Sequence, residues 1–249
     1  MRTLQREAGP DLHIRVSGDL SAGRPVLLVH GMGGDHRTWR ATAAMLRRGG
    51  RPVVSFDLRG HGHSGRTPNY LLADFAADAQ VVVDALNIER ADVIGHSLGA
   101  HTALRLAMAR PELVDHLILE EVPPMARDAS DLAEPVVMAA TLGERVRGLL
   151  ALARDPRPIL RFDRAMADQV VAQFDNSAPD WWADLARVSA PTLVISGGDR
   201  SFLPTRHLQS LADALPDGRL VAIDAGHSVH RDARGEFLSA AAEFLAVPR

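Results

Sequence analysis

Residues 95–99 read Gly95-His96-Ser97-Leu98-Gly99, and they are the most informative motif in the chain. It matches the pattern Gly-x-Ser-x-Gly. The apolar run over residues 92–95 predicts a buried strand before it, and the apolar spacing over residues 98–110 predicts a helix after it. A serine in so sharp a strand-to-helix turn has a strained backbone, and the flanking glycines let the chain turn that tightly. The pattern therefore predicts an exposed, reactive hydroxyl at Ser97.

Strands and helices alternate on both sides of this motif. Such alternation is typical of a parallel sheet covered by helices on both faces, so we expect an α/β fold with a mostly parallel, doubly wound sheet of about eight strands. Residues 2–17 predict two short strands joined by a tight turn, which form an antiparallel edge. The other predicted strands are 25–29, 53–57, 92–95, 117–120, 192–196 and 219–223, and the predicted helices are 36–48, 71–86, 98–110, 205–214 and 232–246.

Residues 123–189 break this alternation. The segment is rich in proline and has no clear buried-strand run, yet its apolar side chains are too frequent for a disordered linker. We therefore predict a helical cap inserted at 123–189 into an α/β core of residues 1–122 and 190–249. Within the cap, helices are expected at 130–142, 143–153 and 161–174. A cap at the carboxyl ends of the strands would cover the edge where such sheets bind ligands.

Five motifs in this order resemble the α/β-hydrolase fold family over essentially the whole chain. The likeness implies that fold with a helical cap, and an active site made of a serine, a histidine and an acid. It is specific for the superfamily and says little about the substrate. The motifs are His30-Gly31-Met32-Gly33-Gly34, Asp57-Leu58-Arg59-Gly60-His61-Gly62-His63-Ser64, Gly95-His96-Ser97-Leu98-Gly99, Gly197-Gly198-Asp199 and Gly226-His227-Ser228.

The resemblance implies roles for four residues. Ser97 is the expected nucleophile, and His227 is the expected general base, with His230 as a rival three residues later. Acyl transfer builds negative charge on the carbonyl oxygen, which two converging backbone N–H groups stabilise. These are expected at Leu98, directly after the nucleophile, and at Met32, in the loop after the first parallel strand.

The acid that orients the histidine has two candidates. Asp199 follows the strand over 192–196, in the chain order Ser, Asp, His that this fold uses. In many relatives, however, the acid lies four residues before the proline that corresponds to Pro204, and that position is Arg200 here. Glu121 follows the strand over 117–120, where some relatives carry the carboxylate instead. Asp199 is the expected acid and Glu121 the alternative.

These residues predict a hydrolase that cleaves an ester, thioester or related acyl bond of a small hydrophobic substrate through an acyl-enzyme. The same pocket serves lyases, perhydrolases, cofactor-free oxygenases and carbon–carbon bond hydrolases in this family, and that alternative stays open. A non-catalytic binding protein is a third hypothesis, although all candidate triad residue types are present. A serine rather than an aspartate at Ser97 argues against haloalkane dehalogenases and epoxide hydrolases.

The composition excludes several classes of protein. The 249 residues include no cysteine and no lysine, which excludes disulfides, thiolate nucleophiles and Schiff-base lysines. With a net charge of −3, the chain has no overall positive charge that would attract nucleic acid or anionic lipid.

The sequence contains no recognisable dinucleotide-binding motif, phosphate-binding loop or set of metal ligands. No apolar run approaches the ~20 residues of a membrane span, and the N-terminus lacks the apolar core of a secretory signal. We expect a small-molecule substrate, no cofactor, no metal, no nucleic-acid or membrane partner and a cytoplasmic location, while the sequence carries no signal for an oligomeric state.

Overall fold

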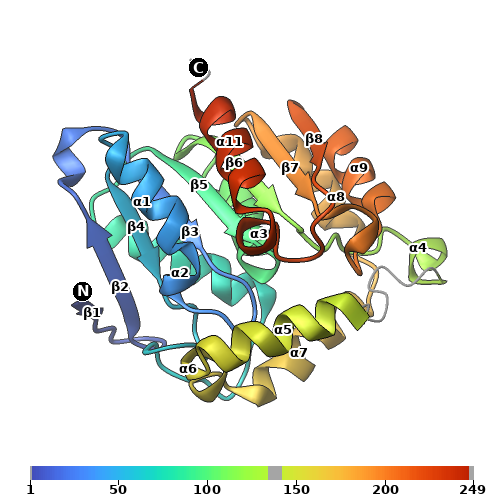
Figure 1. Cartoon of the computed structure of the whole chain (residues 1–249), viewed down its shortest axis with the longest axis horizontal. Coiled ribbons are helices and arrows are strands. Elements are labelled where there is room, and N and C mark those ends of the chain that lie inside the picture. Colours follow the sequence, from blue (N-terminus) through green and yellow to red (C-terminus); the bar gives the residue numbers. More distant parts are fainter. Residues whose placement is uncertain (1, 134–141, 247–249) are drawn as a thin grey trace.

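The computed structural model describes residues 2–133 and 142–246, and its centre is a twisted sheet with helices on both faces (Figure 1). The strand order is β1-β2-β4-β3-β5-β6-β7-β8. The first two pairings, β1 with β2 and β2 with β4, are antiparallel, and the other pairings are parallel. The strands are β1 (Arg2–Leu4), β2 (Leu12–Ser17), β3 (Val26–Val29), β4 (Val53–Phe56), β5 (Ala91–His96), β6 (Val114–Glu120), β7 (Thr192–Ser196) and β8 (Gly218–Ala222).

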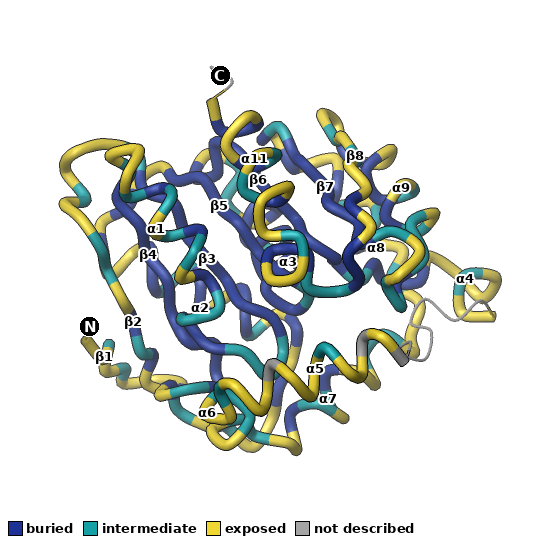
Figure 2. Tube along the Cα trace, viewed as in Figure 1, coloured by how far each residue is buried: buried dark blue, intermediate teal, exposed yellow. Residues whose placement is uncertain are grey.

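The parallel strands β3 to β7 are buried along their whole length, because helices cover both sides of the sheet (Figure 2). Alternate residues of β3 pack into different hydrophobic cores: Leu27 and Val29 pack on one face of the sheet, and Val26 and Leu28 on the other. The first face is covered by α2 (Leu72–Ala85), α3 (Leu98–Ala109) and α9 (Thr205–Ala214), and the second by α1 (Arg40–Arg48) and α11 (Arg234–Leu245).

The expected fold class is confirmed, with element ends that differ from the predictions by a few residues. The predicted helix over 36–48 begins with a 3₁₀ turn, η2 (His36–Trp39), because Asp35 caps it with a reciprocal pair of hydrogen bonds to Thr38. The predicted helix over 232–246 is preceded by a short helix, α10 (Val229–Asp232). The remaining short elements of the core are η1 (Leu20–Ala22) and η4 (Gly198–Arg200).

Between β6 and β7, the described part of the chain forms helices and no strand, apart from one isolated bridge between Ala126 and Ser177. The predicted helix at 130–142 overlaps α4, but residues 134–141 lie outside the described part. Trp181 stacks on His101 of α3 with parallel rings 5.4 Å apart, so the end of this segment packs on the core. The helices are α4 (Ala129–Ala133), α5 (Leu142–Arg154), α6 (Arg157–Leu160), α7 (Arg164–Phe174), α8 (Pro179–Asp184) and η3 (Leu185–Arg187).

Within residues 2–133 and 142–246, no helix has both the length and the apolar character that a membrane crossing requires.

Candidate active site

Ser97 occupies a strained turn between β5 and α3. Its φ of 51° and ψ of −117° are unusual for any residue other than glycine. The Ser97 N–H donates to the carbonyl oxygen of Glu120 at 2.9 Å, which ties the turn to the end of β6. Backbone strain of this kind persists where the surrounding structure enforces it, and it is concentrated at functional sites.

Two glycines permit this turn because they have no side chain. A Cβ atom at Gly95 would lie 2.4 Å from the carbonyl oxygen of Gly99. A Cβ atom at Gly99 would lie 2.3 Å from the carbonyl oxygen of Val29, at the end of β3. Both atoms that an added Cβ would meet are backbone carbonyl oxygens, so neither can move aside as a flexible side chain would.

Replacing Gly99 with alanine is therefore expected to destabilise the protein strongly. Overpacking typically costs about 1–3 kcal/mol, and a clash with backbone should reach or exceed the upper end, which lowers Tm by roughly 6–12 °C in a chain of this size. Thermal denaturation measures the change. Gly148→Ala on α5 is the matched control, because nothing lies within 4 Å of its would-be Cβ. An unchanged Tm for Gly99→Ala would contradict this account of the turn.

The loop after β3 is held by two buried histidines. His61 accepts the Gly33 N–H at its Nε2 (3.1 Å) and donates from Nδ1 to the Arg59 carbonyl oxygen (2.9 Å). His30 donates from Nδ1 to the Gly31 carbonyl oxygen (2.8 Å) and accepts the Leu58 N–H at Nε2 (3.0 Å). Each ring donates once and accepts once, which requires the neutral imidazole. The loop that carries Met32 therefore has a fixed position.

Burial keeps these rings neutral. It lowers the pKa of His61 to about 3, and it also lowers the pKa of His30. At neutral pH both histidines can therefore act as hydrogen-bond acceptors for the backbone beneath the site.

The unfolding free energy is expected to decrease as the pH falls from 6.5 to 5. Burial lowers the pKa of His61 and of His96 to about 3, from an ordinary value of 6.5. Between those values the unfolded chain binds protons that the folded chain does not, so stability is lost with falling pH, by at most about 1.4 kcal/mol per pH unit for each histidine. Urea denaturation at several pH values measures the slope. His61→Gln should reduce it, and a flat profile in the wild type would contradict the burial of neutral imidazoles.

The imidazole of His227 lies beside a buried carboxylate. Its Nδ1 is 2.9 Å from Oε2 of Glu121, which is fully buried, while the His227 side chain is 19% exposed. Phe202 packs on the His227 ring with 4.2 Å between centroids. An acid that holds Nδ1 leaves Nε2 to face a reacting group.

The carboxylate in contact with this imidazole is Glu121, the alternative candidate, and not Asp199, the expected acid. Asp199 is an exposed residue of η4. Its loop instead supplies donors to Glu121: the Gly197 N–H donates to Oε1 at 2.5 Å, and the Ser201 hydroxyl donates to Oε2. Glu121 itself has a φ of 51°, a strained conformation directly after β6.

His96 supports the backbone of His227, a contact that the sequence did not predict. Its Nε2 donates to the His227 carbonyl oxygen at 2.8 Å, and burial lowers the pKa of His96 to about 3. A second histidine–glutamate pair lies nearby: His230 Nδ1 is 2.7 Å from Oε2 of Glu120, and both residues are buried. His230, the rival base, is thus bound to a different acid and packs against Trp39, with 4.7 Å between ring centroids.

Ser97 and His227 line one cavity of about 910 Å³ at the carboxyl ends of the strands. Its size is at the upper end of the range for small-molecule sites. Met32 also lines it, so the structure brings the expected nucleophile, base and oxyanion loop to one space. The rest of the wall comes mainly from the segment between β6 and β7 and is largely apolar, with Ala126, Leu132, Ile159, Phe162, Val170, Val171 and Phe174.

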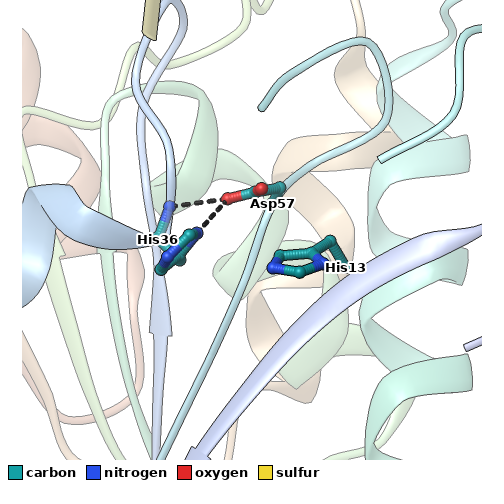
Figure 3. A group of neighbouring side chains, drawn as sticks. All are labelled: His13, His36 and Asp57. Atoms are coloured by element: carbon teal, nitrogen blue, oxygen red, sulfur yellow. Dashed lines mark hydrogen bonds and ion pairs between the residues drawn. The ribbon is translucent and has the colours of Figure 1, made fainter. Parts of the chain in front are cut away.

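Two groups in the described part of the chain have the residue types and spacing of metal ligands. His96, Glu120 and His230 form one, and His13, His36 and Asp57 form the other, with ligand atoms within 4.8 Å of one another in each group. In the second group His36 Nδ1 is 2.7 Å from Asp57 Oδ1, and His13 faces this pair (Figure 3). Both groups already contain a histidine bound to a carboxylate, so each serves the fold as a hydrogen-bonded pair.

Comparison with known proteins identifies the family. Residues 26–241 match the model of the alpha/beta hydrolase family. A putative carbamate hydrolase RutD of Pseudomonas savastanoi pv. phaseolicola is 32% identical over 232 residues, 81% of this chain and 85% of the relative. An sn-1-specific diacylglycerol lipase, ABHD11, of Mus musculus is 26% identical over 247 residues, 89% of this chain and 80% of the relative.

A solved structure agrees with these sequence matches. The crystal structure of a hydrolase from Pseudomonas aeruginosa superposes with a TM-score of 0.78 at 28% identity, covering 99% of this chain and 98% of that one. The chain therefore belongs to the alpha/beta hydrolase family, as its motifs predict.

Proposed function

We propose that the protein is a serine hydrolase that cleaves an ester, thioester or related acyl bond of a small hydrophobic substrate. The observation that carries this proposal is the 2.9 Å contact between His227 Nδ1 and Glu121 Oε2, at the wall of the cavity that Ser97 also lines. A strained serine, an imidazole and a buried carboxylate are the parts that nucleophilic acyl transfer needs.

In the first half of the reaction, Ser97 Oγ attacks the carbonyl carbon of the substrate while His227 Nε2 accepts the hydroxyl proton. Glu121 holds the tautomer with the proton on Nδ1 and stabilises the imidazolium that forms. The hydrogen bond from His96 to the His227 carbonyl oxygen keeps the ring in position. His227 then gives its proton to the leaving group, and an acyl-enzyme remains on Ser97.

In the second half, His227 accepts a proton from water, and the hydroxide attacks the acyl carbonyl. His227 then returns this proton to Ser97 Oγ as the bond between Oγ and the acyl carbon breaks, which releases the acid and restores the serine. In both halves the backbone N–H groups of Met32 and Leu98 donate to the carbonyl oxygen as it becomes negative, each contributing about 3–4 kcal/mol to the transition state. The positive N-terminal end of α3 favours the same charge. His30 and His61 hold the loop of Met32 ready for this contact.

The apolar wall of the cavity supports a hydrophobic acyl group. Phe162, Val170 and Phe174 face the same space as Ser97 and carry no charge. The relatives support the reaction class: one is named a diacylglycerol lipase and the other a putative carbamate hydrolase, and both substrates contain a carbonyl bound to oxygen or nitrogen.

Rapid-mixing kinetics with p-nitrophenyl esters of increasing chain length test the proposal. A burst of p-nitrophenolate equal to the enzyme concentration is expected, followed by slower turnover, because the acyl-enzyme forms before water cleaves it. Medium-chain esters should react faster than acetate. Hydrolysis of none of these esters, together with acid–base turnover of a substrate that leaves no covalent intermediate, would favour the lyase or oxygenase alternative.

A further inference from the structure

A second, smaller cavity of about 170 Å³ lies between α1 and the β2–β4 edge of the sheet. In the antiparallel register Arg15 is opposite Ser55, and Ser17 is opposite Val53, so these side chains share one face. Ala43 and Ala44 of α1 are small and leave the space open. The lining is completed by His36, Arg40 and Arg47.

The charge of this cavity is strongly positive. Arg15, Arg40 and Arg47 line it, and no carboxylate is among its lining residues. In the described part of the chain none of the three forms an ion pair, and Arg47 donates to the carbonyl oxygen of Arg51 instead. Arg15 and Arg40 are exposed and Arg47 is half-buried, so solvent screens their charges in part. Three guanidinium groups at one small cavity, with no carboxylate in its lining, still favour an anion there.

A buried nitrogen without a partner supplies the second observation. His36 is 6% exposed, and its Nε2 has no hydrogen-bond partner among the described residues. Its Nδ1 is engaged by Asp57 Oδ1 at 2.7 Å (Figure 3). Burial opposes the ionisation of Asp57, but the hydrogen bonds from His36 hold the pKa of that carboxyl well below its usual range. The carboxylate therefore keeps a proton on Nδ1, so Nε2 is the ring atom at which a ligand can form a hydrogen bond.

We propose that this cavity binds a tetrahedral oxyanion of the phosphate type. The guanidinium groups of Arg15, Arg40 and Arg47 and the hydroxyls of Ser17 and Ser55 are donors for its oxygens, since arginine pairs well with phosphate. A hydrogenphosphate also carries a P–OH group, which donates to His36 Nε2. The volume suits a phosphoryl group and is below that of sites for whole organic ligands.

The same surroundings argue against a cation at His13, His36 and Asp57. These residues have suitable ligand atoms, but His36 also lines the cavity that holds the three arginines. Their positive charge disfavours a divalent metal ion at this place and favours an anion.

The site adjoins the active site without being part of it. Arg40 also lines a cavity of about 450 Å³ that contacts Met32, Gly33 and Ser228, and these three residues line the cavity of Ser97 as well. The anion is therefore free phosphate or the phosphoryl end of a larger ligand that reaches toward the active site.

Calorimetric titration with inorganic phosphate at low ionic strength tests the proposal. The wild type should bind one equivalent, and Arg15→Gln and Arg40→Gln should each weaken binding at least about tenfold, because each removes one charged donor. Arg48→Gln, which removes the same charge from the exposed last turn of α1, should bind like the wild type. Arg15→Gln should leave the turnover of a neutral ester unchanged, so the result is independent of the proposed hydrolysis.

Glycerol 3-phosphate, in a parallel titration, distinguishes the two sources of the anion. Equal or tighter binding than inorganic phosphate indicates the phosphoryl end of a larger ligand, and binding of inorganic phosphate alone indicates the free ion. The proposal is overturned if neither ligand binds at millimolar concentration, if Arg48→Gln weakens binding as much as Arg15→Gln, or if Zn²⁺ binds here and phosphate does not.

Discussion

Ser97→Ala is expected to lower kcat for a p-nitrophenyl ester by at least about 10⁴-fold while the protein stays folded. The substitution removes the only atom that forms the acyl-enzyme, and what remains is catalysis by binding and the oxyanion N–H groups. A loss of 10⁴-fold corresponds to about 5.5 kcal/mol of transition-state stabilisation. Steady-state kinetics measure it, and a Tm near that of the wild type shows that the fold is intact.

Ser228→Ala is the matched control for this experiment. Ser228 lines the same cavity, next to His227, but the proposed mechanism gives its hydroxyl no part. Its kcat should stay within a few-fold of the wild type. Equal activities of Ser97→Ala and wild type would show that another group performs the chemistry.

Glu121→Gln is expected to lower kcat by about 10³–10⁴-fold with little change in KM. The amide keeps the size of the carboxylate and can still accept the Gly197 N–H, but its NH₂ group faces His227 Nδ1. The ring then adopts the wrong tautomer, and the imidazolium loses its counter-charge. Kinetics at pH 7 to 8 measure the loss.

Asp199→Asn provides the comparison that decides between the two acids. Asp199 is exposed on η4, so its variant should retain nearly full activity. The opposite pattern, with Asp199→Asn inactive and Glu121→Gln active, would require a rearranged loop over residues 197–201 and would contradict the geometry of the site.

The order of strands and helices could be predicted because each buried strand appears in the sequence as a short apolar run. The predictions for β7 and α9 match the structure at both ends. The 3₁₀ turn η2 could not be foreseen, since the hydrogen bonds of Asp35 determine it rather than the helical periodicity. The turn points His36 at Asp57, and His36 also lines the small cavity of Arg15, Arg40 and Arg47.

The acid could not be assigned from sequence because its contact joins residues 106 positions apart. Motif order favours Asp199, and only the Arg200 in the expected position and the Glu120-Glu121 pair at the end of β6 signal the alternative. These glutamates are neighbours in sequence, yet they bind different histidines, Glu120 with His230 and Glu121 with His227. No feature of the sequence indicates the role of His96, because this role depends on the backbone carbonyl of His227 in a distant loop.

Mass spectrometry after reaction with a fluorophosphonate tests whether Ser97 is an activated nucleophile. The reagent phosphonylates a serine only where a base activates it and N–H groups stabilise the oxyanion. We expect one adduct per chain, on the peptide that contains Ser97, formed much more slowly in Glu121→Gln and at the wild-type rate in Asp199→Asn. An unreactive wild type, or an adduct on a serine outside this cavity, would contradict this expectation.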